Sequence, residues 1–207
     1  MLVFVCGPHS AGKTTLIGRL KDKGVVSVAG DEIGKRLFYE RCLNTGALGP
    51  EFELEVVERE LERDAGLAST SGIKVIETWH PGNLAYAAVR NPSMIPELLD
   101  RCTASPLFNR ACGIYLRIPH ETIAVRTKTF SSDRQWAKSF YGQIDLQIPL
   151  MLDRLGLADR TLVVDASRSL DVVYDEVESW LRTFQADPNC ARPHASYGLD
   201  GFPCKSE

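Results

Sequence analysis

Short apolar runs alternate along the chain with longer stretches in which apolar residues recur at helical spacing. The runs predict strands at residues 2–6, 25–28, 73–77, 113–118 and 161–165. The stretches predict helices over 13–23, 33–41, 51–67, 83–90, 94–101, 120–128, a long segment ending near 155, and 170–184. This alternation predicts an α/β fold of three layers. A five-stranded parallel sheet would be covered by helices on both faces.

The segment 51–67 has the clearest helical period. Leu54, Val57, Leu61 and Ala65 recur on one face of it, and charged residues occupy the other. We therefore expect these four residues to face the core.

The apolar periodicity stops near residue 185. Residues 186–207 contain three prolines and two glycines, which predicts an extended or disordered tail after a single domain over residues 1–185.

The 207 residues are 44% hydrophobic and 25% charged, which is typical of a globular protein. No stretch reaches the roughly 18 apolar residues of a membrane span. We expect a cytoplasmic protein, monomeric or homodimeric, without a membrane partner.

Six cysteines are present, and no two of them form a Cys-x-x-Cys pair. Cys6 and Cys112 fall in expected strands and are interpreted as small buried apolar residues. Cys190, His194 and Cys204 are metal-ligating residue types in the tail, but their spacing matches no standard zinc pattern. Metal binding by these three residues stays open at this point.

A glycine-rich loop follows the first expected strand and precedes the first expected helix. Residues 7–14 read Gly-Pro-His-Ser-Ala-Gly-Lys-Thr, which is the phosphate-binding P-loop pattern in its required context. Backbone N–H groups of such a loop surround the β-phosphate, and the helix N-terminus favours the same charge. The sequence therefore predicts ATP and Mg²⁺ as cofactors, with Lys13 on the β- and γ-phosphates and Thr14 on the metal. The expected nucleotide-binding residues are Gly7, His9, Ser10, Ala11, Gly12, Lys13, Thr14 and Thr15.

Three blocks in order resemble the thymidylate kinase and deoxynucleoside kinase group of P-loop kinases: GPHSAGKTT, IYLRIPHETIAVRTK and TLVVDASRSLDVVYDEVESWL. The middle block matches that group's pattern at Tyr115, Leu116, Ile118, Pro119, Glu121 and Arg126. The resemblance covers about residues 1–185. It implies a P-loop kinase fold with a helical lid over about residues 126–140.

The chain departs from this group on the acceptor side. His9 stands where thymidylate kinases usually carry an acidic residue, and residues 77–80 read Glu-Thr-Trp-His in place of Asp-Arg-[Tyr/His]. The resemblance therefore supports the fold and the ATP half better than it supports thymidine monophosphate as the substrate. A GTPase is disfavoured, because the guanine motif Asn-Lys-x-Asp is absent from the sequence.

Residues that directly follow the strands are the candidates for acceptor chemistry, because ligands gather beyond the carboxyl ends of parallel strands. Asp31 is a candidate base or substrate ligand, or else a helix cap, and Glu32 is expected at the surface. Glu77 is a candidate for catalysis and for the Mg²⁺ site, with a buried structural pair as the alternative. Trp79 and His80 are candidates to stack on the acceptor and to hydrogen-bond it, with burial in the core as the alternative.

A basic segment surrounds the expected lid. The resemblance implies that its arginines close over the transferring phosphates, so Arg126 and Arg134 are candidate catalytic residues, with Lys128 beside them. A solvated charged face is the alternative. Arg168 follows the last expected strand and is expected either to stack on adenine or to form a surface salt bridge.

The leading functional hypothesis is an ATP-dependent kinase of a nucleoside, nucleotide or similar small hydroxylic acceptor. A first alternative places the acceptor on a hydroxylated base or an end of a nucleic acid, although the net charge of −3 argues against a large surface for phosphate backbones. A second alternative is a nucleotide-gated regulatory ATPase.

Overall fold

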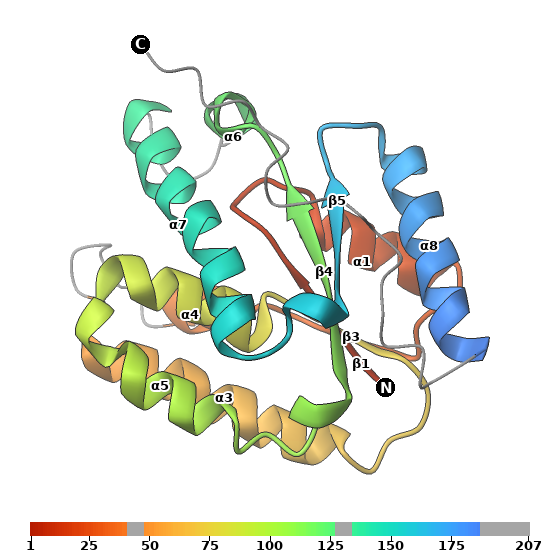
Figure 1. Cartoon of the computed structure of the whole chain (residues 1–207), viewed down its shortest axis with the longest axis horizontal. Coiled ribbons are helices and arrows are strands. Elements are labelled where there is room, and N and C mark those ends of the chain that lie inside the picture. The colour runs from red at the N-terminus through yellow and green to blue at the C-terminus, as the bar shows by residue number, and fades with distance from the viewer. Residues whose placement is uncertain (41–47, 127–133, 187–207) are drawn as a thin grey trace.

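The sheet at the centre of the molecule is parallel and has five strands. The computed structural model describes residues 1–40, 48–126 and 134–186. The strands are β1 (Leu2–Cys6), β2 (Val28–Gly30), β3 (Lys74–Glu77), β4 (Ala111–Arg117) and β5 (Thr161–Asp165). Their order across the sheet is β2-β3-β1-β4-β5, and every pairing is parallel (Figure 1). The carboxyl ends of β1 and β3 therefore meet at the same edge of the sheet.

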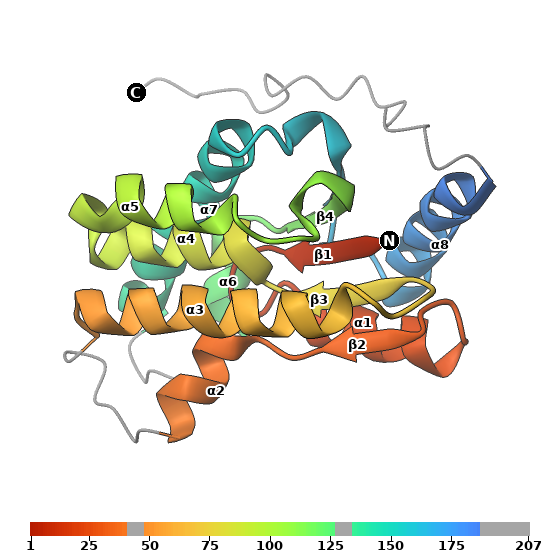
Figure 2. The same ribbon diagram turned by 90° about the horizontal axis from the view of Figure 1, so that it is seen from below.

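Helices cover both faces of this sheet. They are α1 (Lys13–Asp22), α2 (Ile33–Glu40), α3 (Pro50–Leu67), α4 (Trp79–Arg90), α5 (Ile95–Cys102), α6 (His120–Arg126), α7 (Arg134–Arg154) and α8 (Leu170–Ala186). Helices α1 and α8 lie on one face, whereas α3, α4, α5 and α7 lie on the other (Figures 1 and 2). The predicted three-layer α/β/α fold is confirmed.

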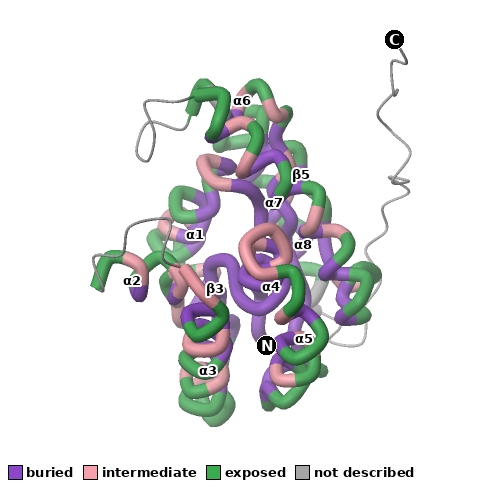
Figure 3. The backbone as a smooth tube through the Cα atoms, turned by 90° about the vertical axis from the view of Figure 1, so that its left-hand side faces the viewer, coloured by how far each residue is buried: buried purple, intermediate pink, exposed green. Residues whose placement is uncertain are grey.

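The core is continuous across the sheet. All five residues of β1 are 0% exposed, which explains why this strand is an uninterrupted apolar run: both of its faces are covered by helices. Cys6 and Cys112 are buried free thiols, as expected. In Figure 3 the buried segments run through the strands, and the exposed segments follow the outer turns of the helices.

Two expected elements lie elsewhere than predicted. The second strand was expected over 25–28 but spans Val28–Gly30, where it pairs with β3. Helix α4 was expected to begin at residue 83 but begins at Trp79, directly after the third strand. Local sequence signals missed both shifts, because strand pairing and close packing against the core decide these boundaries.

The expected buried face of α3 is partly wrong. Val57 is buried, but Leu54 and Leu61 are only half-buried and Ala65 is exposed. The buried face of α3 instead carries Phe52, Glu53, Val56, Val57, Glu60 and Asp64. Each buried carboxylate has a polar partner, so the helix turns a partly charged face toward α4.

Glu53 pairs with Arg90, and Glu60 pairs with Arg63 and accepts a hydrogen bond from Asn83. Asp64 Oδ2 accepts hydrogen bonds from the Trp79 indole N–H and from the Ser105 hydroxyl.

Among the described residues, no helix combines the length and apolar composition needed to cross a membrane.

Candidate functional site

The P-loop lies between β1 and α1, in the predicted context. Gly7 has a φ of +150°, and a Cβ built on it would lie 2.5 Å from the Leu116 carbonyl oxygen of β4. Only glycine tolerates both the backbone angle and this approach. The chain therefore turns tightly from β1 into the loop, and α1 begins at Lys13 directly after Gly12.

Lys13 is held inside this loop. Its Nζ donates to the carbonyl oxygens of Gly7 and Pro8, each at 3.1 Å, and the side chain is only 5% exposed. These contacts keep the ammonium at the concave side of the loop, where backbone N–H groups of a P-loop surround phosphate. The position is suitable for neutralising phosphate charge.

Thr14 and Glu77 lie together, although 63 residues separate them. The Thr14 hydroxyl is 2.9 Å from both carboxylate oxygens of Glu77, to which it donates. Parallel pairing of β1 with β3 aligns Val5 with Glu77, which places this carboxylate at the loop. A hydroxyl and a carboxylate are oxygen donors of the kind Mg²⁺ prefers, so the two residues fit a magnesium ion.

A small cavity opens next to the loop. Its volume is about 110 Å³, and helices α2, α3, α4 and α7 contribute side chains to its wall. It is lined by His9, Glu32, Gly34, Lys35, Phe38, Leu48, Phe52, Val56, Asn83, Tyr86, Arg90, Trp136, Phe140 and Tyr141. We call this cavity the acceptor pocket, because it lies beside the P-loop, where the substrate that receives the phosphoryl group was expected.

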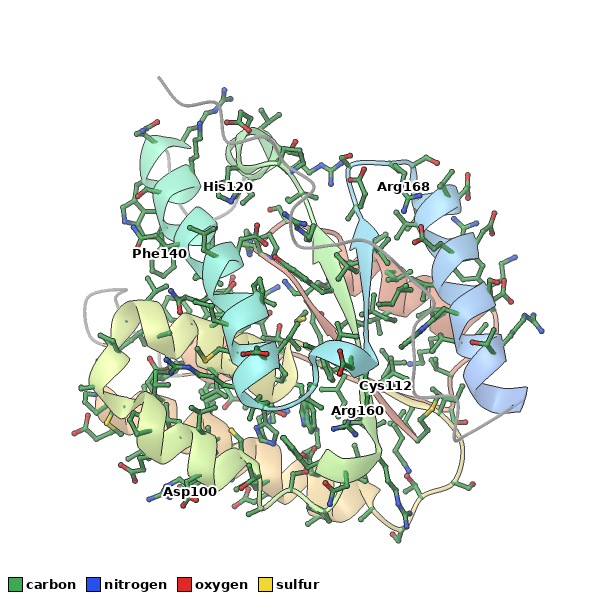
Figure 4. The ribbon with its side chains drawn as sticks, in the orientation of Figure 1. Asp100, Cys112, His120, Phe140, Arg160 and Arg168 are labelled. Carbon is green, nitrogen blue, oxygen red and sulfur yellow. The ribbon has the colours of Figure 1, made fainter. Side chains whose placement is uncertain are left out.

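Aromatic rings form much of the wall of the acceptor pocket. His9 of the loop stacks on Tyr141 at 4.9 Å between ring centroids, and Trp136 stacks on Phe140 at 5.0 Å. Figure 4 shows Phe140 on the side of α7 that faces α4. Flat apolar rings of this kind suit a planar, aromatic ligand.

A cation is fixed in the wall of the acceptor pocket. The Arg90 guanidinium lies over the rings of Phe52 and Tyr86, at 5.4 and 5.3 Å. Its Nε and one terminal nitrogen donate to the two oxygens of Glu53, at 2.8 and 2.9 Å. The bidentate pair fixes the guanidinium plane, which leaves little freedom to lose when a ligand binds.

Glu32, not Asp31, is the carboxylate that lines the acceptor pocket. Glu32 is half-buried and feels the charges of Lys13 and Glu77, whereas the side chain of Asp31 is exposed. Burial raises the pKa of Glu32, and the nearby Lys13 ammonium lowers it in part. The expectation that Glu32 is a surface residue is therefore wrong, and the site places Glu32 where Asp31 was expected.

Two other groups of the acceptor pocket are held neutral. Burial, together with the charges of Lys13 and Lys35, lowers the pKa of His9 to about 4. Burial, reinforced by the Glu32 charge, raises the pKa of Tyr141 to about 12. The loop-side wall therefore presents an uncharged imidazole and an uncharged phenol at neutral pH.

Trp79 and His80 do not line the acceptor pocket. Both side chains are 0% exposed. Trp79 packs on Phe4 at 5.3 Å and its Nε1 donates to Asp64, while His80 Nε2 lies 3.3 Å from the same carboxylate. Their expected role in substrate binding is wrong, because α4 begins at Trp79 and turns both side chains into the core.

The basic residues of the expected lid are only partly described. Arg126 is exposed, and its guanidinium donates to the Ala166 carbonyl at 3.1 Å. Arg134 is exposed at the first turn of α7. Residues 127–133, Lys128 among them, lie outside the described part of the chain, so the lid and the catalytic roles of both arginines stay predictions.

Arg168 forms the surface salt bridge that was one of its two expected roles. It pairs with Glu176 of α8, and its Nε donates to the Asp165 carbonyl at 3.0 Å. Figure 4 places it near the start of α8, far from α7. A contact with adenine stays a prediction.

The pocket residues from α4 and α7 were not expected from the sequence. Tyr86, Arg90, Trp136, Phe140 and Tyr141 come from two helices whose relative position no local pattern reveals. The three aromatic residues within six positions of α7 were the only hint of this wall in the sequence.

Between residues 1 and 186, outside the gaps named above, no group of three potential metal-ligating side chains gathers. Cys190, His194 and Cys204 lie beyond the described residues.

Comparison with known proteins places this site in context. Residues 2–141 match a protein-family model described as an AAA domain. A probable thymidylate kinase of Archaeoglobus fulgidus is 28% identical over 197 residues, a match that covers 89% of this chain and 96% of the relative.

Solved structures with the same fold include two groups of kinases. A deoxyadenosine kinase from M. mycoides, solved with bound dCMP and dCDP, superimposes with a TM-score of 0.65 at 13% identity, over 88% of this chain and all of that one. Thymidylate kinase from Candida albicans superimposes with a TM-score of 0.67 at 13% identity, over 89% and 92%. At these identities the similarity concerns the fold.

Proposed function

Because the chain belongs to the AAA domain family that its residues 2–141 match, we propose that it is a phosphotransferase that uses its P-loop to phosphorylate a nucleoside or nucleotide. ATP is the proposed donor. The observation that carries this proposal is the aromatic acceptor pocket next to Lys13, Thr14 and Glu77. The relatives named as thymidylate and deoxyadenosine kinases support the same class of reaction.

The donor half of the proposed site binds phosphates and metal. Thr14 and Glu77 would hold Mg²⁺, which offsets phosphate charge when it is bound. Lys13 would balance the charge that develops on the β–γ bridging oxygen as the bond to the γ-phosphorus breaks and ADP departs. Its anchoring on two loop carbonyls keeps the ammonium close to where this charge appears.

The acceptor half positions the nucleophile. A base stacked between the rings of the acceptor pocket would place the sugar, or its phosphate, toward the loop. For a nucleoside, the attacking hydroxyl oxygen bonds to the γ-phosphorus and its proton passes to the Glu32 carboxylate. The half-buried position of Glu32 next to Lys13 supports that role, because the pKa of this carboxylate is raised by burial.

A substrate screen tests the proposal. The purified chain is incubated with Mg²⁺, ATP and, one at a time, common nucleosides and nucleoside monophosphates, and product is detected by the mass of one added phosphate. We expect acceptor-dependent ADP formation that disappears in Lys13→Ala. ATP binding without acceptor-dependent turnover across the whole panel would contradict a nucleoside or nucleotide acceptor.

A further inference from the structure

Thr78 occupies a strained position between the two halves of the site. It joins β3 to α4, and its N–H donates to the Val5 carbonyl of β1 at 2.8 Å. Its φ of 71° and ψ of −61° belong to a rare turn conformation, and Trp79 follows with a φ of 50°. Positive φ angles at two successive non-glycine residues cost free energy, and they persist only where the surrounding packing imposes them.

The orientation of the Thr78 side chain is set by α4. A Cβ built on Gly82 would lie 2.6 Å from Thr78 Cγ2, so the methyl group of Thr78 fills the space that a side chain at Gly82 would need. Thr78 is 1% exposed. A threonine with its methyl packed in this way has its hydroxyl restricted to the remaining staggered positions.

The Thr78 hydroxyl is buried and has no partner at normal hydrogen-bonding geometry among the described residues. The last register pair of β2 and β3 is Gly30 with Ile76, so Glu32 and Thr78 each lie two residues beyond it, at the same edge of the sheet. A buried hydroxyl without a partner is destabilising, so its retention at this point calls for one. Lys13, Lys35 and Glu77 are the charged groups that act on Glu32.

We propose that Thr78 is a positioning residue, whose methyl group is locked against Gly82 and whose hydroxyl holds one oxygen of Glu32 so that the other oxygen faces the acceptor. The catalytic part of this inference rests on the proposed function. Thr78 touches neither reacting group and acts through Glu32 alone. The strained backbone serves to aim the hydroxyl, since a relaxed turn would direct the side chain elsewhere.

Matched substitutions at Thr78 separate this role from packing. Thr78→Val keeps the branched shape and replaces the hydroxyl with a methyl group, so we expect a fall in kcat of about 10- to 100-fold. The KM for the acceptor and the melting temperature should change little. Thr78→Ser keeps the hydroxyl and should stay within about threefold of the wild-type kcat.

Gly82 provides an independent test of the orientation. Gly82→Ala places a methyl group against Thr78 Cγ2, which forces the threonine to turn, so kcat should fall as in Thr78→Val. The double variant Gly82→Ala/Thr78→Ser lacks the clashing methyl and should recover most of the activity. Failure of this rescue, with a normal melting temperature in the double variant, would overturn the proposed locking.

A spectroscopic measurement tests the contact without any turnover. The side-chain carboxyl ¹³C resonance of Glu32, assigned by its loss in Glu32→Gln, should shift in Thr78→Val and stay near its wild-type position in Thr78→Ser. An unmoved resonance together with a wild-type kcat in Thr78→Val would overturn the inference. If the wild type phosphorylates no nucleoside or nucleotide, the proposed function fails, and the resonance still decides whether Thr78 holds Glu32.

Discussion

The proposed donor and acceptor halves of the site are built in different ways. Among the described residues, the proposed donor half consists of one contiguous loop, residues 7–15, together with the distant carboxylate of Glu77. The acceptor pocket collects side chains from the loop and from four helices, α2, α3, α4 and α7. Phosphate can be held by backbone N–H groups in a set geometry, whereas an acceptor is recognised by side chains. A loop motif therefore identifies the donor half, and only packing between helices defines the acceptor half.

The largest expected effect concerns the donor half. Lys13→Ala should lower turnover by about 10³-fold or more, because it removes a charge that acts on the transition state. Lys21→Ala, an exposed lysine of the same helix, serves as the control and should have no effect on turnover. The measurement is kcat with the best acceptor, alongside circular dichroism to verify folding. Full activity in Lys13→Ala would contradict a P-loop phosphotransferase.

The next effect compares two adjacent carboxylates. Glu32→Gln should lower kcat by about 10²-fold or more with a nucleoside acceptor, because the amide cannot take the proton of the attacking hydroxyl. Asp31→Asn should remain near the wild type, since Asp31 is exposed and lies outside the acceptor pocket. Both variants should bind ATP normally. The opposite ranking in steady-state kinetics would return the acceptor role to Asp31.

A smaller effect is expected at the aromatic wall. Phe140→Ala removes a ring stacked on Trp136 and should raise the KM for the acceptor about 10-fold, with the KM for ATP unchanged. Leu146→Ala, on the exposed side of the same helix, is the control. Parallel increases in both KM values would show that α7 serves the donor half as well, and would weaken the separation of the two halves.

The smallest effect is one of pH on stability. The pKa of His9 is lowered to about 4, so between its ordinary value of 6.5 and 4 the unfolded chain binds the proton more readily than the folded chain. Stability contributed by the neutral ring is present above pH 6.5 and is lost as the pH falls toward 4. His9→Phe keeps a ring next to Tyr141 but cannot titrate.

The measurement compares the free energy of unfolding of the wild type and His9→Phe by denaturant titration at several pH values. Between pH 6.5 and 4 the wild type should lose about 1 kcal/mol more of this free energy than the variant. The loss is modest because solvent reaches part of the ring and weakens the desolvation penalty for protonation. Parallel stability curves for the two proteins would show that His9 is not shielded from protonation.

Particular residues show where prediction from sequence succeeded. The strand–loop–helix context of the P-loop and the buried Cys6 and Cys112 were expected, because strand runs and glycine spacing are local features. Glu77 was expected beside the loop because it ends a strand, and it lies next to Thr14. Trp79 and His80 were misplaced for a tertiary reason. Residues after a strand normally face the ligand edge, but here an early helix start turned them into the core, where Asp64 satisfies the indole N–H.

The prediction of Asp31 in the position that Glu32 occupies was wrong for a similar reason. The two carboxylates are adjacent in the sequence, and a difference of one residue between β2 and α2 decides which of them lines the acceptor pocket. The carboxylates of α3 illustrate the same limit. Helical periodicity predicts an apolar inner face, yet Glu53, Glu60 and Asp64 are buried because partners from elsewhere in the chain satisfy them.

Local patterns in the amino-acid sequence were enough to predict the alternation of strands and helices, the parallel sheet and the phosphate-binding loop. These depend on short-range periodicity, on glycines and on the backbone, all of which act within a few residues. Contacts between distant segments set which carboxylate lines the acceptor pocket, which aromatic rings form its wall and where the Thr78 methyl group packs. Those outcomes depend on contacts between α2, α3, α4 and α7, helices that meet only after the chain has packed, so no local pattern records them.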